Sequence, residues 1–248
     1  MEDIIKKIKA KKLLNRLDDD FVRRFILDFF KKNDKLRKKY LDRKLKKRDF
    51  EIIVKSVRNE LNKVYGQFWL DKDVLSLDKH RSTQERKQFF IEIYKDIFSV
   101  VGKPKKILDL GSGLNPLAYK FIPGYKKIYF VAVELTDYDC GNLKRYFSDN
   151  KINGEVVKAD LRTYNKFPDV DVCFMFKLLD SLGYEVSEHL LSSINTRYFV
   201  ISFSTENVKG RRMNYPKRSW FERMLSRLGY KYTKKEYANE IFYIVKKN

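Results

Sequence analysis

The sequence is poor in the residues on which disulfide-rich domains and metal sites depend. Its 248 residues include two cysteines, Cys140 and Cys173, and two histidines. Two cysteines are too few for a disulfide framework or a cysteine-rich zinc site, so we expect no bound metal. A run of about 18 uncharged apolar residues, typical of a membrane-spanning helix, is absent. The first residues also lack the apolar stretch of a secretory signal. We therefore expect a cytoplasmic protein with no membrane partner.

Acidic residues are scarce relative to basic ones. The chain has 54 Lys and Arg against 33 Asp and Glu, a net charge of +21 and a pI near 9.7. This excess indicates a polyanionic partner such as nucleic acid, although a soluble protein with a lysine-rich surface has the same composition. The densest run, residues 31–48, holds 11 basic and two acidic side chains. It is either a docking surface for phosphates or a solvated helix face.

Proline and glycine are nearly absent from the first 102 residues. No proline precedes Pro104, and only Gly66 and Gly102 interrupt the pattern. Apolar residues recur there at helical spacing, which predicts helices over residues 20–32 and 83–99. The first would use Phe21, Phe25 and Phe29, and the second would bury Phe89, Phe90, Ile93, Ile97 and Phe98. We therefore expect a basic helical domain over residues 1–102 and a second domain over 103–248.

After Pro104, short apolar runs alternate with helical stretches. The expected strands are residues 106–110, 128–134, 155–158, 170–176, 198–204, 231–236 and 240–246. The expected helices are residues 115–122, 139–150, 185–195 and 216–228. This alternation predicts an α/β domain with a mainly parallel sheet, and the last two strands, which have no helix between them, predict an antiparallel hairpin. A seven-stranded Rossmann-like sheet with such a hairpin is typical of the class I methyltransferase fold that uses S-adenosylmethionine (SAM).

A glycine turn follows the first expected strand. Gly111 permits a tight turn, and Gly113 lets a ligand lie against the backbone. Pro116 stands where a dinucleotide-binding fingerprint needs its third glycine, which argues against that cofactor. Glu134 ends the second expected strand and Asp160 follows the third. A carboxylate at the first position can accept both ribose hydroxyls and one at the second an adenine amino group, so the pattern predicts SAM binding.

Several motifs resemble one family, the 16S rRNA guanine methyltransferases of the Rmt/Arm type associated with aminoglycoside resistance. Residues 80–86 (HRSTQER) resemble its H-x-S-T-x-E-R, and residues 111–117 (GSGLNPL) resemble its G-L-N-P-L segment. Residues 176–182, 203–211 and 239–243 resemble its later motifs. The resemblance covers roughly residues 55–248. Asp180 and Ser204 depart from it, because they replace prolines of the family, and this leaves the RNA target open.

The resemblance implies a SAM-dependent enzyme that methylates ring nitrogen 7 of a guanine near the decoding site, acting as a monomer on the 30S subunit. Carried over by position, the implied cofactor contacts are His80, Arg81, Ser82, Arg86, Gly111, Glu134, Asp160, Leu161, Phe176 and Glu185, to which the turn adds Gly113. Arg86 has a physical reason, because a guanidinium can bind the cofactor carboxylate with two hydrogen bonds. Ring nitrogen 7 carries no proton, so we expect catalysis by positioning and no catalytic base.

RNA contacts are expected in two basic segments. A loop at 209–218 would hold the target guanine, with Tyr215, Trp220 or Arg211 stacking on it, while the run 31–48 would bind rRNA phosphates. The candidate residues are Arg211, Arg212, Tyr215, Lys217, Arg218, Lys38, Lys39, Arg43, Lys46 and Lys47.

Other readings stay open at this point. Lys177, Asp180, Lys209 and Glu240 resemble the tetrad of a ribose 2′-O-methyltransferase. The target is then a ribose rather than a guanine ring. The enzyme could also act on tRNA or another rRNA position, or the chain could be an RNA-binding or ribosome-assembly protein that has lost activity.

Overall fold

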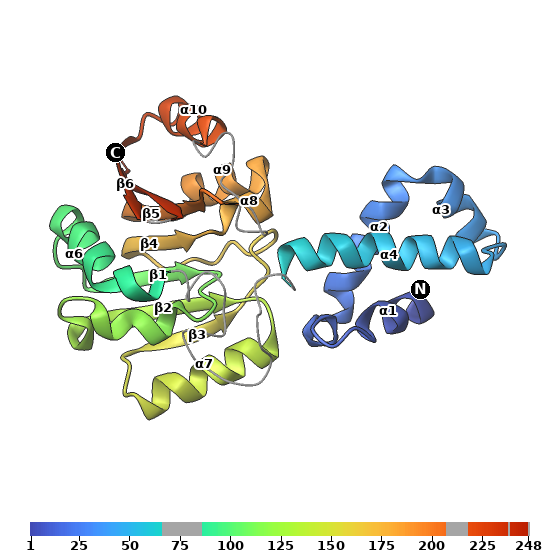
Figure 1. The fold of residues 1–248 in the computed structure, drawn as a ribbon, viewed down its shortest axis with the longest axis horizontal. Helices are drawn as coiled ribbons and strands as arrows, with labels where there is room; N and C mark the ends of the chain where they lie inside the picture. Colours follow the sequence, from blue (N-terminus) through green and yellow to red (C-terminus); the bar gives the residue numbers. More distant parts are fainter. Residues whose placement is uncertain (66–85, 207–217, 238, 248) are drawn as a thin grey trace. The chain divides into compact units, whose positions relative to one another are not determined.

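The computed structural model describes residues 1–65, 86–206, 218–237 and 239–247 of the chain (Figure 1). The chain divides into two compact units, Met1–Lys72 and Asp73–Asn248. The sequence places this boundary at 102, where Gly102 and Pro104 end a helix. The structure assigns the helix before Gly102 to the second unit, where its Tyr94 ring stacks on Phe174 of the sheet.

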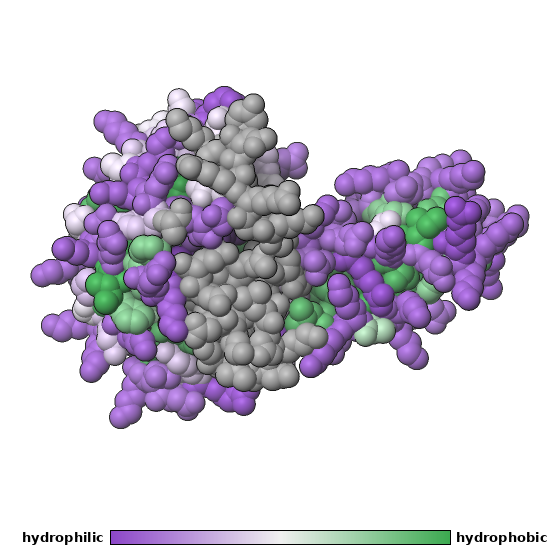
Figure 2. All heavy atoms as spheres, viewed as in Figure 1, coloured by the Kyte–Doolittle hydropathy of each residue, from purple (hydrophilic) through white to green (hydrophobic). Residues whose placement is uncertain are grey.

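The N-terminal unit is a group of short helices. These are α1 (Glu2–Lys9), the 3-10 turn η1 (Leu14–Arg16), α2 (Asp19–Lys32), α3 (Asp34–Leu41) and α4 (Lys47–Val64). Helix α4 packs against α1 and α2, and its buried residues Ile53, Val57 and Leu61 follow the spacing of one helix face. Helix α3 has no buried residue. Figure 2 shows hydrophilic side chains over most of the visible surface of these helices.

The predicted helix over residues 20–32 is present, but its buried face differs from the expected one. The residues that α2 buries are Phe21, Val22, Ile26 and Phe30. Phe25 and Phe29 are only partly buried. Spacing by four fits two adjacent stripes of this helix, and packing against α4 selects the stripe one position later.

The second unit is built on a seven-stranded sheet. Its strands are β1 (Lys106–Leu110), β2 (Tyr129–Glu134), β3 (Gly154–Lys158), β4 (Val170–Phe176), β5 (Thr196–Ser204), β6 (Lys231–Tyr237) and β7 (Glu240–Lys246). Their order is β3-β2-β1-β4-β5-β7-β6, with β1 to β5 parallel and β7 antiparallel to both β5 and β6. The predicted class I methyltransferase topology, with its terminal hairpin, is therefore confirmed.

Helices and turns precede and connect these strands. They are η4 (Lys87–Phe89), α6 (Phe90–Val101), η5 (Asn115–Phe121), η6 (Tyr125–Lys127), α7 (Asp137–Asp149), α8 (Leu179–Leu182), α9 (Tyr184–Ser193) and α10 (Ser219–Arg227). Helix α6 buries Phe90, Ile93, Ile97 and Phe98 as expected, whereas Phe89 is partly buried. The stretch after the glycine turn is 3-10 rather than α-helical, with Pro116 in its first turn. None of the described helices is long and apolar enough to cross a membrane.

Candidate functional site

Three of the predicted cofactor residues come from the same edge of the sheet. Gly111 follows β1, Glu134 ends β2 and Asp160 lies two residues beyond β3. These three strands are parallel, so their carboxyl ends meet at one edge, which is where open α/β sheets bind ligands. Strand β7 runs the opposite way, so its first residue, Glu240, lies at this edge beside Ser204.

The glycine turn leaves β1 in a conformation that favours glycine. Gly111 has a φ of 58° and Gly113 a φ of 53°. A Cβ atom on Gly111 would lie 2.8 Å from Cδ1 of Leu178, so the turn and the residue after β4 fit together without a side chain between them. The hydroxyl of Ser112 is buried and has no hydrogen-bond partner among residues 1–65, 86–206, 218–237 and 239–247.

Glu134 turns its carboxylate back toward the glycine turn. Its Oε1 accepts a hydrogen bond from the Gly113 amide, and its Oε2 accepts one from the Leu135 amide at 3.2 Å. Burial, followed by the nearby Asp139 carboxylate, raises the pKa of Glu134 to about 8. The carboxyl group is therefore held near the turn and titrates in the neutral to mildly alkaline range.

Asp160 begins the turn after β3. Its Oδ1 accepts a hydrogen bond from the Arg162 amide at 3.1 Å and lies 3.7 Å from the Arg162 guanidinium. Its backbone carbonyl accepts bonds from the amides of Thr163 and Tyr164. Leu161 is buried beside it. The carboxylate is thus anchored by its own turn rather than left in a mobile loop.

Arg86 is almost fully buried, with 3% of its surface exposed. Its Nη1 donates to Glu240 Oε1 at 3.2 Å, and its guanidinium lies over the Phe176 ring at 4.9 Å from the centroid. The Nε atom has no hydrogen-bond partner within the part of the chain that the structure describes. The sequence alone is compatible with a surface arginine here, and the structure shows instead that Arg86 is buried.

Glu240 carries a second cation. Lys177 Nζ lies 3.3 Å from Glu240 Oε2, and the Ser202 hydroxyl donates to Glu240 Oε1. Lys177 has a φ of 52°, and its amide donates to the Ser202 carbonyl at 3.0 Å. One buried carboxylate therefore holds two cations at the carboxyl ends of β4 and β5.

The sequence interpretation missed a polar chain beneath the glycine turn. The hydroxyl of Tyr94 donates to Asn115, and the Asn115 amide and the Tyr119 hydroxyl both donate to Asp109 Oδ2 at 2.8 Å. All four residues are buried, and burial raises the pKa of Asp109 to about 6. One sequence feature could have revealed this chain. Asp109 interrupts the apolar run of β1, and a carboxylate buried in a strand needs hydrogen-bond partners. This chain ties α6 and η5 to β1 below the turn.

Glu185 is exposed in the first turn of α9. His80, Arg81, Ser82, Lys209, Arg211, Arg212, Tyr215 and Lys217 fall outside the described residues.

Arg218 and Trp220, two of the predicted RNA contacts, both contact other residues of the sheet unit. Arg218 is 7% exposed, and its guanidinium bonds the Asp180 carboxylate and the Ser204 carbonyl. Trp220 is partly buried and packs edge-on against Phe203, with ring centroids 5.9 Å apart. Both therefore support the local fold. In the sequence, Arg218 follows a basic segment, and nothing in that pattern predicts its pairing with Asp180.

The run 31–48 spans the end of α2, all of α3 and the start of α4. Lys38 and Arg43 are exposed, and so is Lys47 at the first position of α4. Lys39 instead makes a salt bridge to Asp49 at 2.9 Å, and the Lys46 amide donates to the same carboxylate at 3.1 Å. Part of the predicted surface therefore has a structural role at the start of α4.

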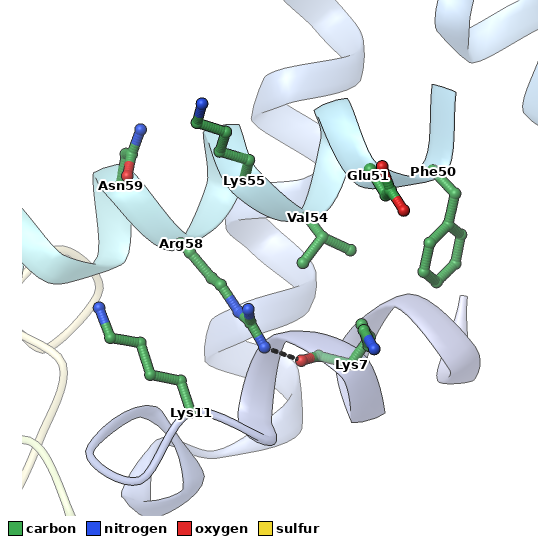
Figure 3. A pocket seen from close by; sticks show the side chains of 8 residues that line it. All are labelled: Lys7, Lys11, Phe50, Glu51, Val54, Lys55, Arg58 and Asn59. Carbon is green, nitrogen blue, oxygen red and sulfur yellow. Dashed lines mark hydrogen bonds between the residues drawn. The ribbon is translucent and has the colours of Figure 1, made fainter. Parts of the chain in front are cut away.

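A second basic feature of this unit is a hollow of about 350 Å³ between α1 and α4 (Figure 3). Its lining includes Lys7, Lys11, Lys55 and Arg58. Arg58 turns inward and donates to the backbone carbonyls of Lys7 and Ile8, which satisfies acceptors at the end of α1. Arg58 is therefore a structural residue, and the lysines supply the positive charge of the hollow.

Residues 53–244 match the family described as ribosomal RNA methyltransferase (FmrO). The chain belongs to this family. The match includes the glycine turn, the acids at the strand ends and the terminal hairpin, which confirms the resemblance drawn from the motifs.

Curated relatives carry the name 16S rRNA (guanine(1405)-N(7))-methyltransferase. One from Serratia marcescens is 31% identical over 185 residues, covering 71% of this chain and 70% of the relative. One from Frankia casuarinae is 27% identical over 177 residues, covering 68% of this chain and 61% of the relative. The matched region thus spans about three fifths of the length of the Frankia protein.

Solved structures share the fold. The 16S rRNA methylase RmtB has a TM-score of 0.74 at 24% identity, with 100% of this chain and 98% of that chain covered. The 16S rRNA methyltransferase RmtF, solved with S-adenosyl-L-homocysteine, has a TM-score of 0.81 at 20% identity, with the same coverage. At these identities the likeness establishes the architecture.

Proposed function

We propose that this protein is a SAM-dependent methyltransferase that modifies ring nitrogen 7 of a guanine in 16S rRNA. The observation that carries the proposal is the sheet edge in a member of the FmrO family. There the Gly111 turn, the Glu134 carboxylate and the Asp160 carboxylate follow three adjacent parallel strands. The relatives named above are 16S rRNA methyltransferases acting on ring nitrogen 7 of a guanine, which supports the same substrate class.

The polar atoms at this edge fit the parts of SAM. Glu134 would accept the ribose hydroxyls, Asp160 would accept from the adenine amino group, and Leu161 would pack beside the base. The Arg86 Nε and the Ser112 hydroxyl are buried polar atoms with no partner in the described ranges, so a polar ligand group would remove an unfavourable state at either one. SAM, when bound, supplies the methyl group.

The chemistry needs positioning more than proton transfer. Ring nitrogen 7 of guanine has a lone pair and no proton, so no residue must act as a base. Lys177 and Arg86, the buried cations at this edge, are both paired to Glu240. They fix the geometry where β4 and β5 end and β7 begins, and they leave the lone pair of the guanine as the nucleophile.

The ribose 2′-O alternative is less well supported. It needs Asp180 beside Lys177 and Glu240, but the Asp180 carboxylate is bonded to Arg218. A carboxylate engaged in this way is not available to orient a catalytic lysine. We therefore keep the guanine ring as the target and extend the proposal to the 30S subunit, with the run 31–48 as a phosphate-binding surface and the protein acting as a monomer in the cytoplasm.

A cofactor titration and a mapping experiment test this function separately. Calorimetry should detect SAM binding to the wild type, and Asp160→Ala should weaken it by about 1–3 kcal/mol, the range for loss of a buried hydrogen-bond partner. RNA affinity should stay unchanged in this variant. If the wild type bound no SAM, the proposed activity would be overturned in favour of an inactive RNA-binding protein.

Mapping identifies the nucleotide. Purified 30S subunits would be treated with the protein and SAM, reduced with borohydride and cleaved with aniline, which breaks RNA at 7-methylguanosine. Primer extension should then stop at one new guanine near the decoding site. Methyl transfer to 30S subunits without any new aniline cleavage would overturn the proposed ring position and leave a ribose or another base atom as the target.

A further inference from the structure

The hollow between α1 and α4 collects cations that have no counter-ion. Lys7, Lys11 and Lys55 line it and are exposed, and none of them forms an ion pair within the part of the chain that the structure describes. By contrast, Lys9 of the same helix α1 pairs with Asp19. Unpaired positive charge that converges on one concave site attracts an external anion.

The size and lining of the hollow suit an organic ligand rather than a lone ion. Its volume of about 350 Å³ lies within the range of small-molecule sites, about 300–1,000 Å³. Figure 3 shows Phe50 and Lys7 toward one end of the hollow and Lys11 toward the other. The Phe50 ring is half-buried and Val54 is buried, so α4 offers an apolar wall as well as charge.

The hollow is formed before any ligand binds. Arg58 Nε donates to the Ile8 carbonyl at 3.2 Å, and its Nη2 donates to the Lys7 carbonyl. These bonds fasten the end of α1 to α4 without using the ammonium group of any lysine. A site held open in this way loses little entropy when a ligand enters.

We propose that this hollow binds one unpaired nucleotide of the RNA substrate. Its lysines neutralise the phosphates on either side of the nucleotide, and the Phe50 ring stacks on the base. Glu51, an acid in the same lining, suits a base amino group and disfavours a second phosphate there. An acidic protein segment would match the lysines but would leave the aromatic and apolar wall unused.

This contact adds to the run 31–48 and is separate from the SAM edge. Lys7 and Lys11 precede residue 53, where the family match begins, so that match does not include them. The inference rests on the proposed function, which supplies the RNA. Lysine contacts to phosphate bring affinity without sequence choice, so the hollow helps to dock the substrate and does not select the methylated guanine.

The first test compares two pairs of lysines in the full chain. Lys7→Ala with Lys11→Ala should weaken binding to 30S subunits by about fivefold or more, with a shallower dependence on salt, because phosphate contacts are lost. Lys6→Ala with Lys12→Ala is the matched control, since it removes the same charge from adjacent exposed positions outside the lining. Equal losses in the two pairs would overturn the hollow as a site.

Phe50→Leu tests the stacking contact separately from charge. It keeps an apolar side chain and removes the ring, so affinity for 30S subunits should fall by about fivefold while the salt dependence stays unchanged. Its unfolding midpoint in urea serves as the control for folding. Unchanged affinity in a folded Phe50→Leu variant would overturn the base contact.

Lysine acetylation read by mass spectrometry locates the contact without enzymatic activity. A short single-stranded RNA should slow acetylation of Lys7, Lys11 and Lys55 but not of Lys6. A duplex of the same sequence and polyglutamate should protect them much less, because neither offers an unstacked base. Equal protection by polyglutamate would overturn the nucleotide as occupant and leave a general anion-binding surface.

The outcomes separate this proposal from the proposed function. If the wild type methylates no RNA while single-stranded RNA protects the three lysines, the methyltransferase function fails and the nucleotide site stands. If 30S subunits are methylated while the three lysines stay fully reactive in the presence of either RNA, the nucleotide site is overturned and the function stands.

Discussion

The two units of this protein differ in whether they bury positive charge. The basic side chains of residues 1–65 are exposed or half-buried, whereas the sheet unit buries Arg86 and Arg218. Residues 1–65 hold 22 basic and 11 acidic side chains, and many of the basic ones are exposed, such as Lys38 with 74% of its side chain accessible. In the sheet unit, Arg86 and Arg218 are 3% and 7% exposed, and each meets a carboxylate. Exposed charge attracts a polyanion without fixing its geometry, whereas buried charge fixes geometry and has little long-range effect.

Among the predictions that test this difference between the units, the largest expected effect comes from removing the carboxylate of Glu240. Glu240→Ala leaves Arg86 and Lys177 without their shared carboxylate, so the free energy of unfolding should fall by about 3–5 kcal/mol, as expected when a buried pair loses one partner. Urea unfolding monitored by fluorescence measures this loss. Asp34→Ala, which breaks the exposed pair with Lys38, is the control and should barely move the midpoint. Similar losses of unfolding free energy in Glu240→Ala and Asp34→Ala would contradict the distinction between buried and exposed ion pairs.

Asp109 offers a pH test of burial in the sheet unit. Its pKa is raised from 3.8 to about 6, so its ionised form is disfavoured in the folded state. The stability that the protonated group contributes is fully present below about pH 4 and is lost as pH rises through about 6, a change of about 3 kcal/mol. Asp109→Asn lacks this titration, so its unfolding free energy should gain on the wild type by that amount between pH 4 and 7. Parallel stability curves for the two proteins would contradict the assignment.

These two sites show why the sequence predicts the sheet better than the site. Alternation of apolar runs and helical stretches predicts all seven strands and the terminal hairpin. Burial on both faces leaves a continuous apolar signal in five of them, β1, β2, β4, β5 and β7. The position of Glu134 at a strand end follows from the same pattern. The partner of Arg218 does not, since Asp180 lies 38 residues away and the pairing depends on how α8 and α10 pack.

The N-terminal unit shows a second limit. Helical spacing predicts α2 but not which of two adjacent stripes is buried, because Phe21, Phe25 and Phe29 fit the period as well as Val22, Ile26 and Phe30. The domain boundary has the same cause. An apolar helix face can pack against either unit. Gly102 marks where helix α6 ends, but the sequence there does not predict which unit the helix packs against.

Reversing exposed charge should alter RNA affinity without altering the fold. Arg43→Glu with Lys47→Glu changes two exposed residues of the run 31–48 and should weaken binding to 30S subunits by about tenfold, with a shallower dependence on salt. Filter binding at several salt concentrations measures both. Lys126→Glu with Lys127→Glu makes the same change of charge in η6, before β2, and should have a much smaller effect. Equal effects would mean that net charge, not this surface, determines affinity.

The smallest expected effect concerns Glu134, whose half-buried carboxylate would accept hydrogen bonds from neutral ribose hydroxyls. Its pKa of about 8 means that the ionised form is the minority below that pH. Ribose hydroxyls can donate to both oxygens of the ionised form but only to the carbonyl oxygen of the protonated form. Affinity for a ribose ligand should therefore rise several-fold from pH 6.5 to 8.5 as the proton leaves. Titration with 5′-methylthioadenosine avoids the amino group of SAM, which ionises in the same range. Glu134→Gln should bind more weakly at high pH and lose the pH dependence, and a slope shared by both proteins would place the titrating group elsewhere.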